Sequence, residues 1–239
     1  MNGKSMHWVN RFAALGLVVG LVAGLAAVGS AQSVGGQAYS TYVNTPLGSS
    51  AQSPMAVLPA VSGTDGAEAD AEGGAMSVAG ALSSDFLNSI TSGEIGAAEA
   101  GAQSTSSAAS VNILNGLITA DEVVANVMSS ASQDGAFSSA DGSTFTNLAI
   151  AGVGSLSGDS PITPNMNISL PGVGYVVLNE QIPSGDGVSS SGLTVNMIHV
   201  YLQSITGGTV DPLTGQVIGG ITTTTGEIIV GSATSSVGP

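Results

Sequence analysis

Short runs of β-branched and apolar residues, separated by turn signals, dominate the second half of the chain. Clusters such as Gly158-Asp159, Gly185-Asp186-Gly187 and Asp211-Pro212 interrupt these runs. Strands at a spacing of roughly 8–12 residues are typical of an all-β sandwich or barrel. We therefore predict an antiparallel β-sandwich. The best strand candidates are residues 55–61, 111–118, 144–153, 167–170, 174–182, 193–205 and 227–232.

The alternation is clearest between residues 193 and 202. In a regular strand, one face would carry Val195, Met197, His199 and Tyr201, and the other Thr194, Asn196, Ile198, Val200 and Leu202. Because both faces contain apolar residues, we predict that this strand is central in its sheet.

Residues 119–132 carry conflicting signals. Thr119-Ala-Asp-Glu122 matches a helix capping box, and Val123, Val124, Val127 and Met128 recur at helical spacing. However, the Val, Asn and Ser residues that dominate this stretch are weak helix formers. A strand is the favoured prediction, with one helix as the alternative.

Residues 1–31 have the features of a secretory signal peptide. Lys4 and Arg11 precede an uncharged, largely apolar run over residues 12–28, and Gly29-Ser30-Ala31 offers a cleavage site before Gln32. The alternative is an uncleaved signal anchor, since 17 residues approach the length that spans a membrane. We predict cleavage, leaving one exported domain over residues 32–239 with no transmembrane segment.

The charge of this domain excludes several classes of function. Lys4 and Arg11 are the only Lys or Arg residues, so residues 32–239 carry sixteen acids and no such base. A chain without cations cannot neutralise phosphates, which argues against nucleic acid as a partner. The sequence also lacks cysteine, and therefore has no disulfides, thiol nucleophile or thiolate metal site.

His199 is the only histidine after residue 31, and histidine is a frequent general acid–base residue. A serine-hydrolase triad would need a histidine within reach of a serine nucleophile. The sequence contains no Gly-x-Ser-x-Gly nucleophile elbow. We therefore predict a structural role for His199, no catalytic residues and no enzymatic activity.

Four acids concentrate in a short Ala- and Gly-rich stretch near residues 62–74, which we expect to be flexible. They are Asp65, Glu68, Asp70 and Glu72. Oxygen ligands suit Ca²⁺, but the stretch lacks the spacing of an EF-hand loop. The hypotheses are a weak calcium site at these four residues and a solvated acidic loop; we expect no other cofactor.

An ordered set of segments resembles the choice-of-anchor P family of bacterial exported proteins. The set runs from Val111-Asn-Ile-Leu-Asn-Gly-Leu-Ile-Thr-Ala-Asp121 through Gly174-Tyr-Val-Val-Leu-Asn-Glu-Gln181 and Leu193-Thr-Val-Asn-Met-Ile-His-Val200 to Glu227-Ile-Ile-Val-Gly-Ser-Ala233. The resemblance implies a secreted domain without established catalytic residues. Since the sequence closes on Ser235-Ser-Val-Gly-Pro239 without a sorting motif, we expect release or non-covalent retention.

Together these observations predict a non-enzymatic, secreted or cell-surface protein with a structural or adhesive role at the surface or in the extracellular matrix. Its expected partners are other copies of itself or components of the cell envelope or matrix. A secreted binding module for a sugar or protein is the alternative, and a secreted hydrolase is a third.

Overall fold

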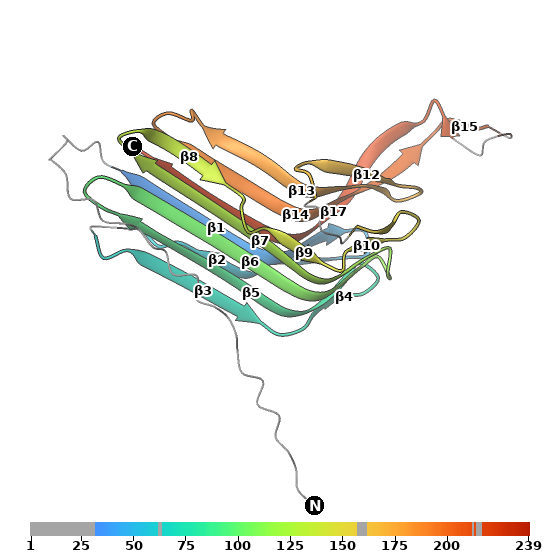
Figure 1. Cartoon of the computed structure of the whole chain (residues 1–239). Helices are drawn as coiled ribbons and strands as arrows, with labels where there is room; N and C mark the ends of the chain where they lie inside the picture. The colour runs from blue at the N-terminus through green and yellow to red at the C-terminus, as the bar shows by residue number, and fades with distance from the viewer. Residues whose placement is uncertain (1–31, 62–63, 157–161, 212, 214–216) are drawn as a thin grey trace, which may run out of the picture.

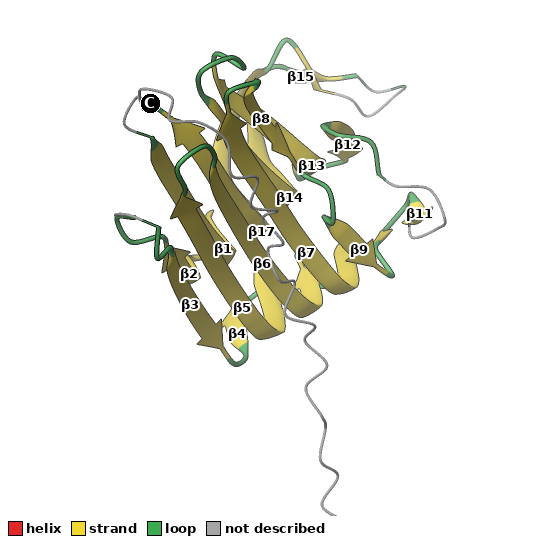
Figure 2. Ribbon diagram, turned by 60° about the vertical axis from the view of Figure 1, so that its left-hand side comes forward, coloured by secondary structure: helices red, strands yellow, loops and turns green. Residues whose placement is uncertain are grey.

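The computed structural model describes residues 32–61, 64–156, 162–211, 213 and 217–239. Within these ranges the chain is all-β, and two antiparallel sheets pack face to face (Figures 1 and 2). The predicted β-sandwich is confirmed. No helix long and apolar enough to cross a membrane occurs in the described ranges. The predicted signal peptide, residues 1–31, lies outside them.

The first sheet has six strands in the order β12-β13-β14-β17-β1-β2. Their bounds are Met166–Leu170 for β12, Gly174–Gly185 for β13, Ser191–Thr206 for β14, Ile221–Gly238 for β17, Ser33–Thr45 for β1 and Gly48–Val57 for β2. Strand β14 lies inside the sheet, between β13 and β17, which confirms its predicted central position.

The second sheet has nine strands, and its main path is β11-β10-β7-β6-β5-β3. The bounds along this path are Gly154–Ser155, Ala149–Ile150, Ile118–Ser132, Ala100–Ile113, Leu82–Ile95 and Ala67–Gly73. Strand β4 (Met76–Val78) pairs with β5, whereas β8 (Gly135–Ser139) and β9 (Thr144–Thr146) pair with β7. A separate pair, β15 (Thr209–Val210) and β16 (Val217–Ile218), lies away from both sheets.

The apolar core fills the space between the sheets. Large, fully buried side chains come from both of them, among them Ile113, Ile118, Leu178, Ile198 and Ile228. Burial of each such side chain contributes roughly 1.5–3 kcal/mol. The alternation of apolar and polar residues along the strands therefore determines which face of each strand turns inward.

Elsewhere between the sheets, small hydroxyl side chains replace the large apolar ones. Ser129 on β7 lies 2.6 Å from the hydroxyl of Ser235 on β17 and 2.8 Å from that of Ser138 on β8. Ser40 on β1 donates to the carbonyl of Asn88 on β5 at 2.9 Å. A Cβ atom at Gly36 would overlap Thr91 and Ser104, so the sheets approach closely here.

Several strand predictions need correction. Residues 119–132 are strand, in β7, as favoured over a helix. Residues 111–118 do not form one strand, because Leu114, Asn115 and Gly116 adopt positive φ in the turn between β6 and β7. Residues 144–153 form two short strands, and residues 67–73 of the segment expected to be flexible form strand β3. Strands β5 and β6 were not predicted, since their Ser, Ala and Gly residues are poor or neutral β-formers.

Candidate functional site

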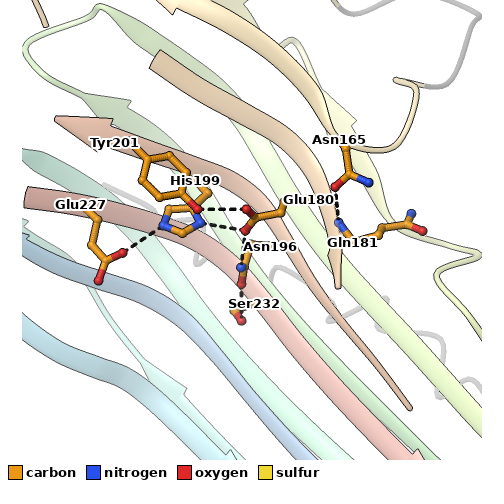
Figure 3. A network of polar contacts seen from close by, with 8 residues as sticks. All are labelled: Asn165, Glu180, Gln181, Asn196, His199, Tyr201, Glu227 and Ser232. Carbon is orange, nitrogen blue, oxygen red and sulfur yellow. Dashed lines mark hydrogen bonds and ion pairs between the residues drawn. The ribbon is translucent and has the colours of Figure 1, made fainter. Parts of the chain in front are cut away.

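A network of polar side chains lies on the outer face of the six-stranded sheet, with His199 at its centre (Figure 3). The Nδ1 atom of His199 lies 2.7 Å from Glu180 Oε2, and its Nε2 atom lies 3.1 Å from Glu227 Oε2. These residues belong to the neighbouring strands β13, β14 and β17. His199 is only 6% exposed, so one buried imidazole links two carboxylates across three strands.

Three further side chains complete this network. The hydroxyl of Tyr201 donates to Glu180 Oε1 at 2.9 Å, and the amide of Asn196 donates to Glu180 Oε2 at 2.8 Å. The hydroxyl of Ser232 in turn donates to Asn196 Oδ1 at 2.8 Å. Both oxygens of Glu180 are therefore bonded, which offsets the partial loss of solvent around this carboxylate.

A shift in the strand alternation brings these residues to one face. Met197 and Ile198 are consecutive in β14, yet both point into the core, so Asn196 on one side and His199 on the other both point outward. The prediction that His199 shares a face with Met197 and Val195 is wrong. A strictly alternating strand would have placed Asn196 and His199 on opposite faces.

The neighbouring strands β13 and β17 have the same irregularity in their alternation, at the residues opposite Met197. Met197 lies opposite Asn179 on β13 and Gly231 on β17, as the pairs on either side of it establish. Asn179 has a φ of 49° and Gly231 a φ of 69°, the left-handed conformation that reverses the alternation locally. Because all three strands reverse their alternation at the same position, the pairing register of β13 and β14 does not change there. Glu180 therefore lies opposite Asn196 and on the same face.

Glu180 is the most strongly perturbed acid of the network. Burial acts to raise its pKa, but hydrogen bonds from His199, Asn196 and Tyr201 and the charge of His199 outweigh it and lower the pKa to about 2. Burial and then the hydrogen bond to Glu180 raise the pKa of Tyr201 above its ordinary value. The network therefore holds Glu180 as a carboxylate and Tyr201 as a neutral phenol.

This geometry allows His199 to act as a cross-link rather than as a base. Each of its nitrogens faces a carboxylate, and the hydroxyl of Ser232 is bonded to Asn196 instead. The two carboxylates lie on opposite sides of the ring, so they do not converge with it on one point. Across the described ranges, no three His, Asp or Glu side chains form a group that could hold a metal ion.

The four acids of the calcium hypothesis lie elsewhere. Asp65 is in the turn before β3, and Glu68, Asp70 and Glu72 occupy alternate, exposed positions of β3 at the edge of the nine-stranded sheet. Alternate residues of a strand are about 7 Å apart along one face. The fold therefore lines these carboxylates up rather than gathering them, and calcium binding stays a prediction.

The outer face of the six-stranded sheet also collects all four tyrosines of the sequence, and we call this surface the tyrosine face. The ring of Tyr201 stacks on His199 at a centroid distance of 3.9 Å and on Tyr175 at 4.7 Å. Tyr42 lies opposite Ile229, which lies opposite His199, and Tyr39 lies opposite Ser232. Paired residues share a face. The aromatic side chains thus span β13 to β1.

Exposed apolar side chains extend the tyrosine face toward both edges of the sheet. Met55 lies opposite Tyr39, Val57 opposite Gln37, and Ile182 opposite Thr194, and all three apolar side chains are about half exposed. Tyr39 is itself 8% exposed, whereas Tyr42, Tyr175 and Tyr201 are partly exposed. A surface that combines partly exposed aromatic rings and exposed apolar groups with polar ones is characteristic of interaction sites.

A cleft of about 710 Å³ opens between the sheets on the side of β13 and β8. Phe145, Leu193 and Met197 form apolar parts of its lining, and Asn179 and Gln181 contribute polar groups. Gln181 donates from its side chain to Asn179 Oδ1 at 3.0 Å. The volume falls in the range of small-ligand sites, roughly 300–1,000 Å³.

Sequence reasoning identified His199 but missed the other members of its network, Glu180, Glu227, Asn196 and Tyr201. One signal was available, because Glu180 and Glu227 are acids inside β-rich segments of a chain whose only basic side chain after residue 31 is His199. The shift at Met197 left no such signal, since both Met197 and Ile198 are apolar.

Comparison with known proteins adds no relative. No protein-family model, no curated protein and no solved structure matches this chain.

Proposed function

We propose that this protein is a non-enzymatic, exported component of the cell surface or extracellular matrix, and that it has an adhesive role. In this proposal the tyrosine face is the surface that contacts the partner. The gathering of all four tyrosines on one outer face is the observation that carries it.

Tyrosine is well suited to such a surface. Its ring offers a large contact area with little loss of conformational freedom, and its hydroxyl can bond to a polar partner. The stack of Tyr175, Tyr201 and His199 and the bonds to Glu180 hold part of this face rigid before any partner arrives. A preorganised surface loses less entropy on binding.

The contacts of His199 favour this role over that of a hydrolase. A catalytic histidine must present one nitrogen to a nucleophile, and here both nitrogens contact carboxylates. The predicted signal peptide and the resemblance to the choice-of-anchor P family point to the same class of exported, non-catalytic proteins. Location outside the cell is part of the proposal.

The second candidate is a secreted binding module for a small ligand. The cleft beside β13 favours it, since apolar Phe145 and Met197 line it together with the polar Asn179 and Gln181. In that case ligand binding would respond to changes in the cleft and not to changes in the tyrosine face.

The test is retention of the protein on producing cells. We expect Tyr42→Ala combined with Tyr175→Ala to shift most of the cell-bound protein into the medium, because both side chains lie on the proposed contact surface and outside the hydrogen-bond network of Glu180. The measurement is a quantitative blot of washed cells and medium.

The control variant is Phe86→Ala combined with Phe137→Ala. These aromatic side chains are 75% and 54% exposed and belong to the nine-stranded sheet. Their removal should leave retention unchanged. Equal behaviour of the two double variants would contradict the role of the tyrosine face, and export failure of the wild type would contradict the location.

A further inference from the structure

Strands β14 and β17 continue beyond the six-stranded sheet as a two-stranded ribbon that runs toward β15 (Figure 1). The last neighbours of the pair are Gly174, opposite Leu202, and Asn44, opposite Glu227. Beyond them the ladder continues with four pairs, in which Gln203, Ser204, Ile205 and Thr206 lie opposite Thr224, Thr223, Thr222 and Ile221. We call these eight residues the ribbon arm.

The β17 edge of the ribbon arm is open in the described part of the chain, and the β14 edge is open beyond Gln203, whose backbone N–H donates to the carbonyl of Val173 at 2.8 Å. No described strand pairs with the outer side of residues 204–206 or of residues 221–224. The backbone groups on these sides can therefore form a ladder with another strand. An isolated two-stranded ribbon is only marginally stable in water, so a further strand would stabilise the arm.

The ribbon arm ends at a pair of diglycines. Gly207-Gly208 on one strand and Gly219-Gly220 on the other separate the pair Thr206–Ile221 from the pair Thr209–Ile218. Gly207, Gly208 and Gly219 adopt positive φ, and this backbone geometry interrupts the ladder. The arm is thus a defined element with four consecutive pairs.

The arm lacks the devices that protect other edges of the molecule. Strand β3, at the edge of the nine-stranded sheet, presents Glu68, Asp70 and Glu72, and charge repulsion disfavours pairing there. The arm instead offers Ile221 followed by threonines, which have high β-propensity, and no charged residue or proline. Ile205 and Ile221 are 53% and 71% exposed.

The distribution of charge favours a second copy of the chain as the partner of this edge. Fifteen of the sixteen acids lie outside residues 202–226, which contain only Asp211. A basic partner would bind most favourably to the acidic surfaces of the two packed sheets, which form the body of the molecule, and not to the uncharged arm. Two copies of the chain repel each other through their bodies, and contact through the uncharged arms keeps those bodies apart.

From the open edges, the composition and the charge distribution together, we propose that the ribbon arm joins two copies of this chain. The edge of β17 around Thr223 pairs antiparallel with the same edge of the second copy, about a two-fold axis next to Thr223. The two ribbons then form one four-stranded sheet, in which threonine side chains face threonine side chains without like charges.

The first test is the mass of the purified protein in solution, measured by sedimentation equilibrium over a wide concentration range. We expect a reversible dimer. Thr223→Asp should weaken it at least tenfold, because the two-fold axis brings the new carboxylates together. Thr144→Asp adds the same charge at an exposed threonine of β9 and should leave the dimer unchanged.

The second test uses the absence of cysteine from the sequence. Thr223→Cys introduces a single thiol next to the proposed axis and should give disulfide-linked dimers on mild oxidation, whereas Thr144→Cys should give few. A wild type that stays monomeric at all concentrations would overturn the proposal. So would a dimer that is indifferent to Thr223→Asp, or equal cross-linking of the two cysteine variants.

Dimerisation through the ribbon arm is independent of partner binding by the tyrosine face. The double variant of Tyr42 and Tyr175 should dimerise normally, and Thr223→Asp should keep any binding that the tyrosine face provides to a single copy.

Discussion

At the scale of single residues, His199 is the only side chain of the described residues that can form an ion pair with an acid. The described residues contain no Lys or Arg, so His199 is the one side chain there that can become a cation. It lies between Glu180 and Glu227, and both contacts are within ion-pair distance. Removing one partner of a buried polar pair leaves the other unsatisfied, which costs more than the pair itself contributes.

Glu180→Gln should therefore lower the free energy of unfolding at pH 7 by about 1–3 kcal/mol. The folded pKa of Glu180, about 2, lies below its ordinary value of 4.5. Its charge thus stabilises the fold above pH 4.5, and this contribution declines as the pH falls toward 2. The difference between variant and wild type should shrink over that range in chemical denaturation.

The control for this prediction is Glu122→Gln, at an exposed acid of β7. It should change stability little at any pH. A deficit of Glu180→Gln that stays constant from pH 7 down to about pH 3 would show that the carboxylate charge of Glu180 is not what stabilises the network.

At the scale of elements, the shift through Asn179, Met197 and Gly231 determines what the six-stranded sheet can present. It lets Leu178, Ile198 and Val230 pack in the core while Glu180, Asn196 and Ser232, on the other side of the shift, face outward. There is little space for a side chain at Gly231, since a Cβ atom there would lie 2.9 Å from Val123 Cγ1 and 3.3 Å from Met197 Cβ.

Gly231→Ala should therefore destabilise the protein by about 2–4 kcal/mol, from left-handed strain plus overpacking. Gly152→Ala is the matched control, because Gly152 has a φ of 84° and no heavy atom lies within 4 Å of the position that its Cβ would take. It should cost only the strain, about 1–2 kcal/mol. Equal losses in equilibrium denaturation would mean that the contacts of Gly231 with the core do not matter.

The strands differ in how well the sequence predicts them. Strands β13 and β14 are rich in Val, Ile and Leu, and their positions followed from those residues. Strands β5 and β6 escaped prediction, because their inward positions hold residues such as Ser89, Thr91 and Ser104, which pack only once another sheet lies close. The shift at Met197 depends on contacts between strands, and no single strand encodes it.

At the scale of the whole molecule, the two outer faces differ in chemistry. The six-stranded sheet presents tyrosines and half-exposed apolar side chains, and its two acids there, Glu180 and Glu227, are bonded to His199. The nine-stranded sheet presents exposed acids on β3 and β7. This asymmetry favours the tyrosine face as the contact surface of an otherwise acidic protein, because a partner meets fewer acids there than on the nine-stranded sheet.

Hydroxyl-radical footprinting of the protein on intact producing cells tests this account most directly. Oxidation of Tyr42, Tyr175 and Met55 in cell-bound protein is compared with that in purified protein, and Phe86 and Phe137 serve as internal controls. We predict several-fold protection of the first three residues and none of the two phenylalanines. Unprotected tyrosines, or equal protection of the phenylalanines, would contradict recognition through the tyrosine face.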